Sequence, residues 1–246
     1  MPASSNFQQA IQEAQRGSLV GPNVVNKALP YVGGGMVLTA AGVLGGISLM
    51  ESSPGLFMPL FWVALIGNFI LFFVAQNAAS KGNNATALPI LTAYSLITGF
   101  TLSGIVSYAV AAAGIGAVGT AALATGFTFV LASFFGRRMS DNVGQALTGV
   151  VGLGIVGLVI AMVVQLIGSI FAPGIFSAGG FELMIAGFGT VLFVGAAFVD
   201  FYTMPRTYRD DQYLAGALGM YLTYINLFIF ILRLVIALQG GGGRRD

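Results

Sequence analysis

The sequence predicts an all-α fold, a polytopic membrane protein built as a bundle of seven transmembrane helices. Of its 246 residues, 57% are hydrophobic and only 7% are charged, and the mean hydropathy is +0.90. Soluble domains carry roughly 25% charged residues, so this composition is typical of an integral membrane protein. A span needs about 20 mostly apolar residues, and seven runs of that kind follow one another along the chain. They cover residues 29–50, 56–76, 87–113, 115–135, 144–171, 181–202 and 214–238.

Polar residues, glycines and a proline separate these runs and also predict their orientation. In chain order the breaks are marked by Glu51, Lys81, the glycines Gly114, Gly116 and Gly119, the pair Arg137 and Arg138, Glu182, and finally Pro205 with Arg206 and Arg209. With seven crossings, every Lys and Arg between spans falls on one side, and only the two glutamates lie on the other. Basic loops favour the cytoplasm. We therefore expect a cytoplasmic N-terminus, an external C-terminus and a location in a bacterial inner (plasma) membrane.

The spans form one membrane domain, residues 27–239, between two polar segments. The N-terminal segment, residues 1–26, lacks the apolar core of a signal peptide. Within it, residues 7–19 form either a short surface helix or a disordered tail. The C-terminal segment, residues 240–246, is a flexible Gly/Arg tail. It either lies outside with two arginines or follows a last helix that does not cross completely.

The composition excludes several classes of function. The chain has no cysteine and no histidine, which removes thiolate chemistry, disulfides, Cys/His metal sites and a Ser–His protease. The only lysines are Lys27 and Lys81, both outside the spans, so a retinal Schiff base is excluded. No GxxxxGK[ST] loop and no dense basic patch is present, which argues against nucleotide and nucleic-acid binding. We find no catalytic constellation and expect no enzyme activity, no cofactor and no dedicated metal site.

Small residues predict close packing of the helices. The chain contains 36 glycines, and small residues let membrane helices approach each other. The first span has the GxxxG pair Gly42 and Gly46. The fifth span carries Gly144, Gly149, Gly152, Gly154 and Gly157. We expect these glycines to pack within one bundle, with self-association as the alternative.

Three polar residues in the spans have ordinary structural interpretations. Asn68 and Gln165 are expected to hydrogen-bond between helices, worth about 1 kcal/mol each. Arg233, near the outer end of the last span, is expected to reach the interface or pair with an acid. Antiparallel packing of the last two spans would put Asp200 at about the depth of Gly219 to Thr223. Arg233 lies ten residues, or about 15 Å, beyond Thr223 and is therefore a poor direct partner for Asp200.

Asp200 is the most informative residue, because it is an acid near the end of an apolar run. An isolated charge in hydrocarbon costs several kcal/mol, so an acid there is a functional-site candidate. Pro205 ends the helix soon afterwards. Either Asp200 faces the bundle interior near Thr223 and Asn226 and gates or conducts a cation, or it forms an ion pair at the interface. The partners available for such a pair are Arg206 and Arg209.

Three sequence motifs resemble a known family. Residues 217–234, ALGMYLTYINLFIFILRL, resemble the ALxLYLDxINLFxxLLRL signature of the Bax inhibitor-1-like family, whose bacterial members include YccA-type proteins. Residues 198–202, FVDFY, resemble the element that closes the family's sixth span. Residues 92–103, TAYSLITGFTLS, are similar to its third-span pattern. The resemblance covers essentially residues 27–238, and the final-span motif is its specific part.

The resemblance implies a fold and a function. It implies a bundle with the last helix near its centre and a cation leak, chiefly of calcium, that is controlled by pH. In the family pattern an acid ending the sixth span and an acid in the last span form a pair that shares a proton. Asp200 matches the first acid, but Thr223 stands at the second position and cannot ionise. The basic partner in the second span has no counterpart, with Gln76 and Asn77 nearest.

A second function of a different class also follows from the resemblance. Bacterial relatives are associated with a membrane-anchored AAA protease that they modulate in membrane-protein quality control. The polar segment 1–26 would then be the handle that the protease grips, and no conduction is required. The predicted partners therefore include the lipid bilayer in both cases. A cation leak adds calcium ions or protons, and protease modulation adds a membrane AAA protease.

Overall fold

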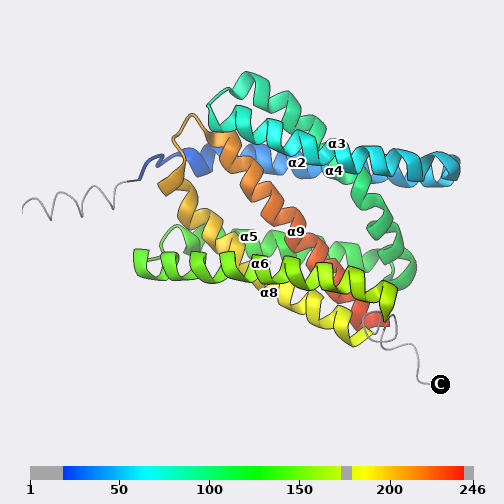
Figure 1. The fold of residues 1–246 in the computed structure, drawn as a ribbon. Coiled ribbons are helices and arrows are strands. Elements are labelled where there is room, and N and C mark those ends of the chain that lie inside the picture. Colours follow the sequence, from blue (N-terminus) through cyan, green and yellow to red (C-terminus); the bar gives the residue numbers. More distant parts are fainter. Residues whose placement is uncertain (1–18, 173–178, 241–246) are drawn as a thin grey trace, which may run out of the picture.

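The computed structural model describes residues 19–172 and 179–240, and within these ranges it contains seven helices (Figure 1). Each is long and apolar enough to cross a membrane. In chain order they are α2 (Val24–Ser52), α3 (Pro54–Ser80), α4 (Asn84–Ala113), α5 (Ile115–Gly136), α6 (Asp141–Phe171), α8 (Gly179–Thr207) and α9 (Tyr213–Gly240). The structure thus confirms the all-α fold and the seven spans.

The helix ends differ from the predicted spans by a few residues. α2 begins at Val24, five residues before the apolar run, because Val24 and Val25 are buried in the core. A carboxylate from another segment, Asp210, accepts a hydrogen bond from the Asn23 backbone nitrogen at 2.9 Å. An acid at a helix start satisfies free N–H groups. Gly114, at φ 76°, turns the chain between α4 and α5, which confirms the glycine turn.

The helices form two groups with α9 between them. α4 contacts both α2 and α3 in the first group, and α8 contacts both α5 and α6 in the second. α9 contacts α2, α3, α4, α5 and α8 and crosses between the two groups (Figure 1). The most deeply buried large side chains include Tyr221, Leu227 and Leu232 of α9. The last helix is therefore near the centre of the bundle, as the family resemblance implies.

Glycines bring α2 and α4 into backbone contact. A Cβ added at Gly42 would overlap the carbonyl oxygen of Leu96, and one added at Gly99 would overlap that of Thr39. A Cβ added at Gly46 would overlap the side chain of Ser103 on α4. The GxxxG pair therefore packs inside the bundle, as predicted.

The glycines of α6 fulfil the packing prediction only in part. Gly144 packs against Tyr202 and Gly154 against Leu192, both on α8. The other three have open space where a side chain would be: Gly149, Gly152 and Gly157.

Candidate functional site

Asp200 lies two turns before the end of α8, where the central helix α9 passes it. The residue is partly exposed, but its Oδ2 atom is fully buried and has no hydrogen-bond partner within the described ranges. The Thr223 side chain of α9, itself only 9% exposed, is close enough to interact with the carboxyl group. The structure therefore brings these two predicted residues together at the interface between α8 and α9.

Asn226, the third candidate, lies one turn further along α9. Its Nδ2 atom donates to the carbonyl oxygen of Leu222 in the same helix at 2.9 Å. No bond between Asn226 and Asp200 is present in the described part of the chain. Two of the three predicted residues are thus in contact, and Asn226 is satisfied within its own helix.

The structure corrects the ion-pair interpretation of Asp200. The Arg206 guanidinium donates to Asp141 Oδ1 of α6, from Nε at 3.2 Å and Nη2 at 3.0 Å. Arg209 donates to both carboxylate oxygens of Asp211, each at 3.1 Å. Arg206 is six residues beyond Asp200, which rotates it by about 240° around the helix, and Arg209 follows the helix end. Both predicted basic partners therefore face other carboxylates.

Several basic residues lie at the end of the bundle that carries the α8–α9 loop, among them Lys27, Arg137, Arg206 and Arg209. Asp210 of this loop accepts from the Asn23 side chain at 3.2 Å and lies 3.9 Å from the Lys27 Nζ atom. The Arg209 guanidinium beside Asp211 holds the pKa of that carboxyl below its usual range, so Asp211 is charged at neutral pH. The contacts of Asp210 with Asn23 and Lys27 fix the loop to the start of α2. We call this end of the bundle the basic end.

The predicted terminal segments lie largely outside the description. Of residues 7–19, for which the sequence predicts either a short surface helix or a disordered tail, only Leu19 is among the described residues, and residues 241–246 of the Gly/Arg tail are outside them. The described end of the N-terminal segment contacts the α8–α9 hairpin, because the Gly21 nitrogen donates to the carbonyl oxygen of Pro205 at 3.0 Å.

An ion pair at the opposite end joins α6, α8 and α9. Arg233 donates from Nε to Glu182 Oε1 at 2.7 Å and from Nη2 to Oε2 at 2.9 Å. Gln165 Nε2 donates to the same carboxylate at 2.9 Å. This confirms that Arg233 pairs with an acid and that Gln165 bonds between helices. A two-bond guanidinium–carboxylate contact fixes direction as well as distance, so it holds α9 in register with α8.

Glu182→Gln is expected to lower the stability of the bundle by about 1–2 kcal/mol. The change leaves the Arg233 guanidinium without its counter-charge in a partly buried place, and breaking a buried pair costs about 3–5 kcal/mol before discounting for exposure. Thermal unfolding in detergent measures the loss. Glu51→Gln, which removes an exposed acid from the predicted loop at the same end, is the control. Equal midpoints for the two variants would contradict the structural role of the pair.

A buried cluster of hydroxyl groups escaped the sequence interpretation. The Thr39 hydroxyl of α2 hydrogen-bonds to the Tyr221 hydroxyl of α9 at 2.5 Å and donates to the carbonyl oxygen of Ser95 in α4 at 3.1 Å. Nearby, Asn68 and Thr98 exchange hydrogen bonds at 3.0 and 3.3 Å between α3 and α4, which confirms the inter-helix bond predicted for Asn68. Tyr221, a phenol within an apolar run, was the available signal, because a buried hydroxyl needs a partner.

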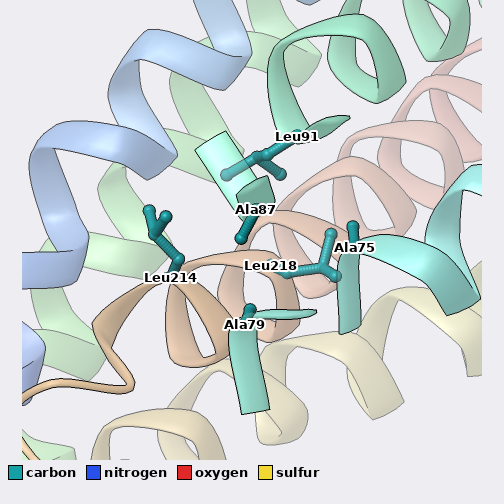
Figure 2. Close-up of a pocket in the computed structure, with 6 residues that line it drawn as sticks. All are labelled: Ala75, Ala79, Ala87, Leu91, Leu214 and Leu218. Atoms are coloured by element: carbon teal, nitrogen blue, oxygen red, sulfur yellow. The ribbon is translucent and has the colours of Figure 1, made fainter. Parts of the chain in front are cut away.

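On its α3–α4 side, the start of α9 is closed by apolar side chains. Six of them converge from three helices around a crevice of about 150 Å³ that leaves no room for a water molecule (Figure 2). They are Ala75, Ala79, Ala87, Leu91, Leu214 and Leu218. Water and ions are therefore excluded from this crevice beside the start of α9.

Comparison with known proteins identifies the family. Residues 21–240 match the family Bax1-I, described as inhibitor of apoptosis-promoting Bax1. An uncharacterized membrane protein of Streptococcus pyogenes serotype M1 is 32% identical over 199 residues, which are 76% of this chain and 77% of that protein. Bax inhibitor 1 of Schizosaccharomyces pombe is 35% identical over 82 residues, 32% of this chain and 31% of that protein. An uncharacterized protein of Helicobacter pylori strain J99 is 26% identical over 215 residues, 86% of this chain and 85% of that protein. The chain therefore belongs to the Bax inhibitor family of multi-pass membrane proteins.

Proposed function

We propose that the protein is a leak pathway for cations, calcium among them, in which the charge of Asp200 controls passage. The observation that carries this proposal is the Asp200 carboxyl group, which has a buried oxygen without a hydrogen-bond partner among the described residues, where α8 meets the central helix. An unsatisfied buried polar atom costs free energy. Ionisable residues within spans mark ion and proton pathways, and a passing cation would supply the missing partner.

The surroundings of Asp200 suit weak and transient binding of a cation. Within the described residues, no three His, Cys, Asp or Glu side chains gather to hold a metal ion. Calcium takes six to eight oxygen ligands, and Asp200 with the Thr223 hydroxyl offers only a few of them. A cation at this place would keep much of its water. Conduction requires binding that is weak enough to release the ion, so this arrangement favours a leak over storage.

The nearby arginines do not neutralise the site. Arg206 is bound to Asp141 and Arg209 to Asp211, and each of these ion pairs is internally balanced. Neither guanidinium then competes with a cation for the Asp200 carboxylate. Protonation of Asp200 would remove its charge, so the same group gives the leak a response to pH without a second acid.

Calcium flux into liposomes that contain purified protein tests the proposal. Asp200→Asn is expected to lower the flux roughly tenfold, because the amide keeps an oxygen ligand but loses a charge, and each 1.4 kcal/mol corresponds to a factor of ten. Glu51→Gln is the control, since it removes an acidic charge from an exposed position and leaves the Arg209–Asp211 pair intact, so it is expected to leave the flux unchanged. Equal flux in wild type and Asp200→Asn, with both proteins folded, would refute the proposal.

A further inference from the structure

An apolar pocket of about 380 Å³ lies between α2, α4, α5 and α9. Its walls come from both helix groups and from the central helix that crosses between them (Figure 1). Among its lining residues only Thr39 and Tyr224 carry a polar group. Thr39 is already hydrogen-bonded within the hydroxyl cluster. An apolar cavity of this kind does not hold water well, so its natural occupant is a hydrocarbon group.

The pocket runs along one half of the membrane. On α2 it extends from Met36 to Ile47, eleven residues or about 16 Å of helix. The hydrocarbon core of a bilayer is about 30 Å thick, so one leaflet is about half of that. The far end of the pocket reaches Ile115, the first residue of α5, at the turn opposite the basic end. Its length and position therefore match the acyl chain of a lipid in that leaflet.

The rim of the pocket is open to the side, where lipid surrounds the bundle. Leu44 of α2 is 69% exposed and Ile115 of α5 is 72% exposed, and both line the pocket. Two small side chains, Ala40 and Ala122, line it from α2 and α5 and are also exposed. A chain can thus enter sideways from the bilayer without a change in the helices.

We propose that this pocket binds one acyl chain of a phospholipid from the leaflet opposite the basic end. The ester end of the chain lies beside Ile47 and Ile115, and its methyl end lies against Tyr224 and Ile225 in the middle of the membrane. The bound acyl chain contacts α2, α4 and α5 together, and it also packs against the face of α9 that lines the pocket. This site does not depend on cation conduction, so it stands or falls separately from the proposed function.

Photo-crosslinking in vesicles tests the site. The full-length protein is reconstituted in phosphatidylcholine and phosphatidylglycerol with a small share of phosphatidylcholine that carries a diazirine on one acyl chain, either near the ester or near the methyl end. Mass spectrometry of the peptides then locates the label. We expect the methyl-end probe to label the region of Tyr224 and the ester-end probe to label the region of Ile115. Labelling in proportion to exposure, with the lipid-facing α6 peptides reacting as strongly as the pocket, overturns the proposal.

Pocket-filling variants provide the second arm. Ala40→Phe and Ala122→Phe place a ring in the pocket and are expected to reduce labelling near Tyr224 about fivefold. Ala41→Phe, an equal change at the next, exposed residue of α2 outside the pocket lining, is expected to leave it unchanged. Labelling that survives both filling variants overturns the proposal, as do cross-links that show a second copy of the chain in the pocket. If a filling variant fails to fold, the wild-type label map decides alone.

Discussion

Gly99→Ala is expected to destabilise the bundle by about 3 kcal/mol or more and to lower the yield of folded protein sharply. The added Cβ would overlap the carbonyl oxygen of Thr39 and would lie 2.9 Å from the Cα atom of Gly42. These are backbone atoms that cannot rotate away, so α2 and α4 must separate. Overpacking in cores costs about 1–3 kcal/mol, occasionally more. Separation would also stretch the bonds of the Thr39 hydroxyl to Ser95 and Tyr221.

Gly104→Ala is the matched control for this prediction. Gly104 lies on the same helix, five residues further on, and a Cβ there would meet nothing within 4 Å. Alanine gains up to about 1 kcal/mol over glycine in a helix interior, so this variant should be as stable as wild type or slightly more stable. The midpoint of thermal unfolding in detergent is the measurement. Similar midpoints for the two variants would show that α2 and α4 are not in backbone contact.

In the proposed cation pathway, Thr223→Asp is expected to create a tighter and strongly pH-dependent calcium site. It restores an acid at the position where the family pattern has one and places it beside the Asp200 carboxyl group. Two unit charges about 4 Å apart interact with about 4 kcal/mol at an effective dielectric of 20. Desolvation of the charges offsets part of this interaction energy. We therefore expect the apparent calcium affinity of Thr223→Asp at pH 8 to be roughly a hundredfold higher than that of the wild type. Two close carboxylates share one proton, so acidification should reverse the gain steeply.

Thr223→Asn controls for the change in shape. Asparagine has nearly the size of aspartate and a carbonyl oxygen but no charge, so it should show neither the affinity gain nor the steep response to pH. Half-saturation of calcium flux at several pH values is the measurement. If Thr223→Asp and Thr223→Asn behave alike, the side chain at this position does not face the Asp200 carboxyl group.

The spans were predictable because each helix that crosses a membrane must itself contain a long run of apolar residues. All seven runs became helices, and the single turn residue Gly114 was enough to separate α4 from α5. The helix starts were less predictable, since the start of α2 depends on Asp210, which is 187 residues away. Hydropathy measures one segment at a time and contains no information about such a partner.

The candidate site was predictable only where depth or family position identified a residue. Asp200 stood out as an acid in an apolar run, and antiparallel packing of the last two spans correctly placed it near Thr223. Nearness in sequence suggested Arg206 as its partner, but helix rotation directs that side chain to Asp141 of α6. The bond between Thr39 and Tyr221 links α2 to α9, and neither sequence position indicates the other.

The most direct test of the account is the dependence of calcium flux on pH in wild type and Asp200→Asn, measured side by side in liposomes with the same protein content. Acidification and the substitution remove the same charge. We therefore predict that the wild-type flux changes with pH and meets the Asp200→Asn flux at the acidic end, while the variant gives a flat profile. Parallel profiles with the same pH response in both proteins would contradict the claim that Asp200 controls the passage of cations.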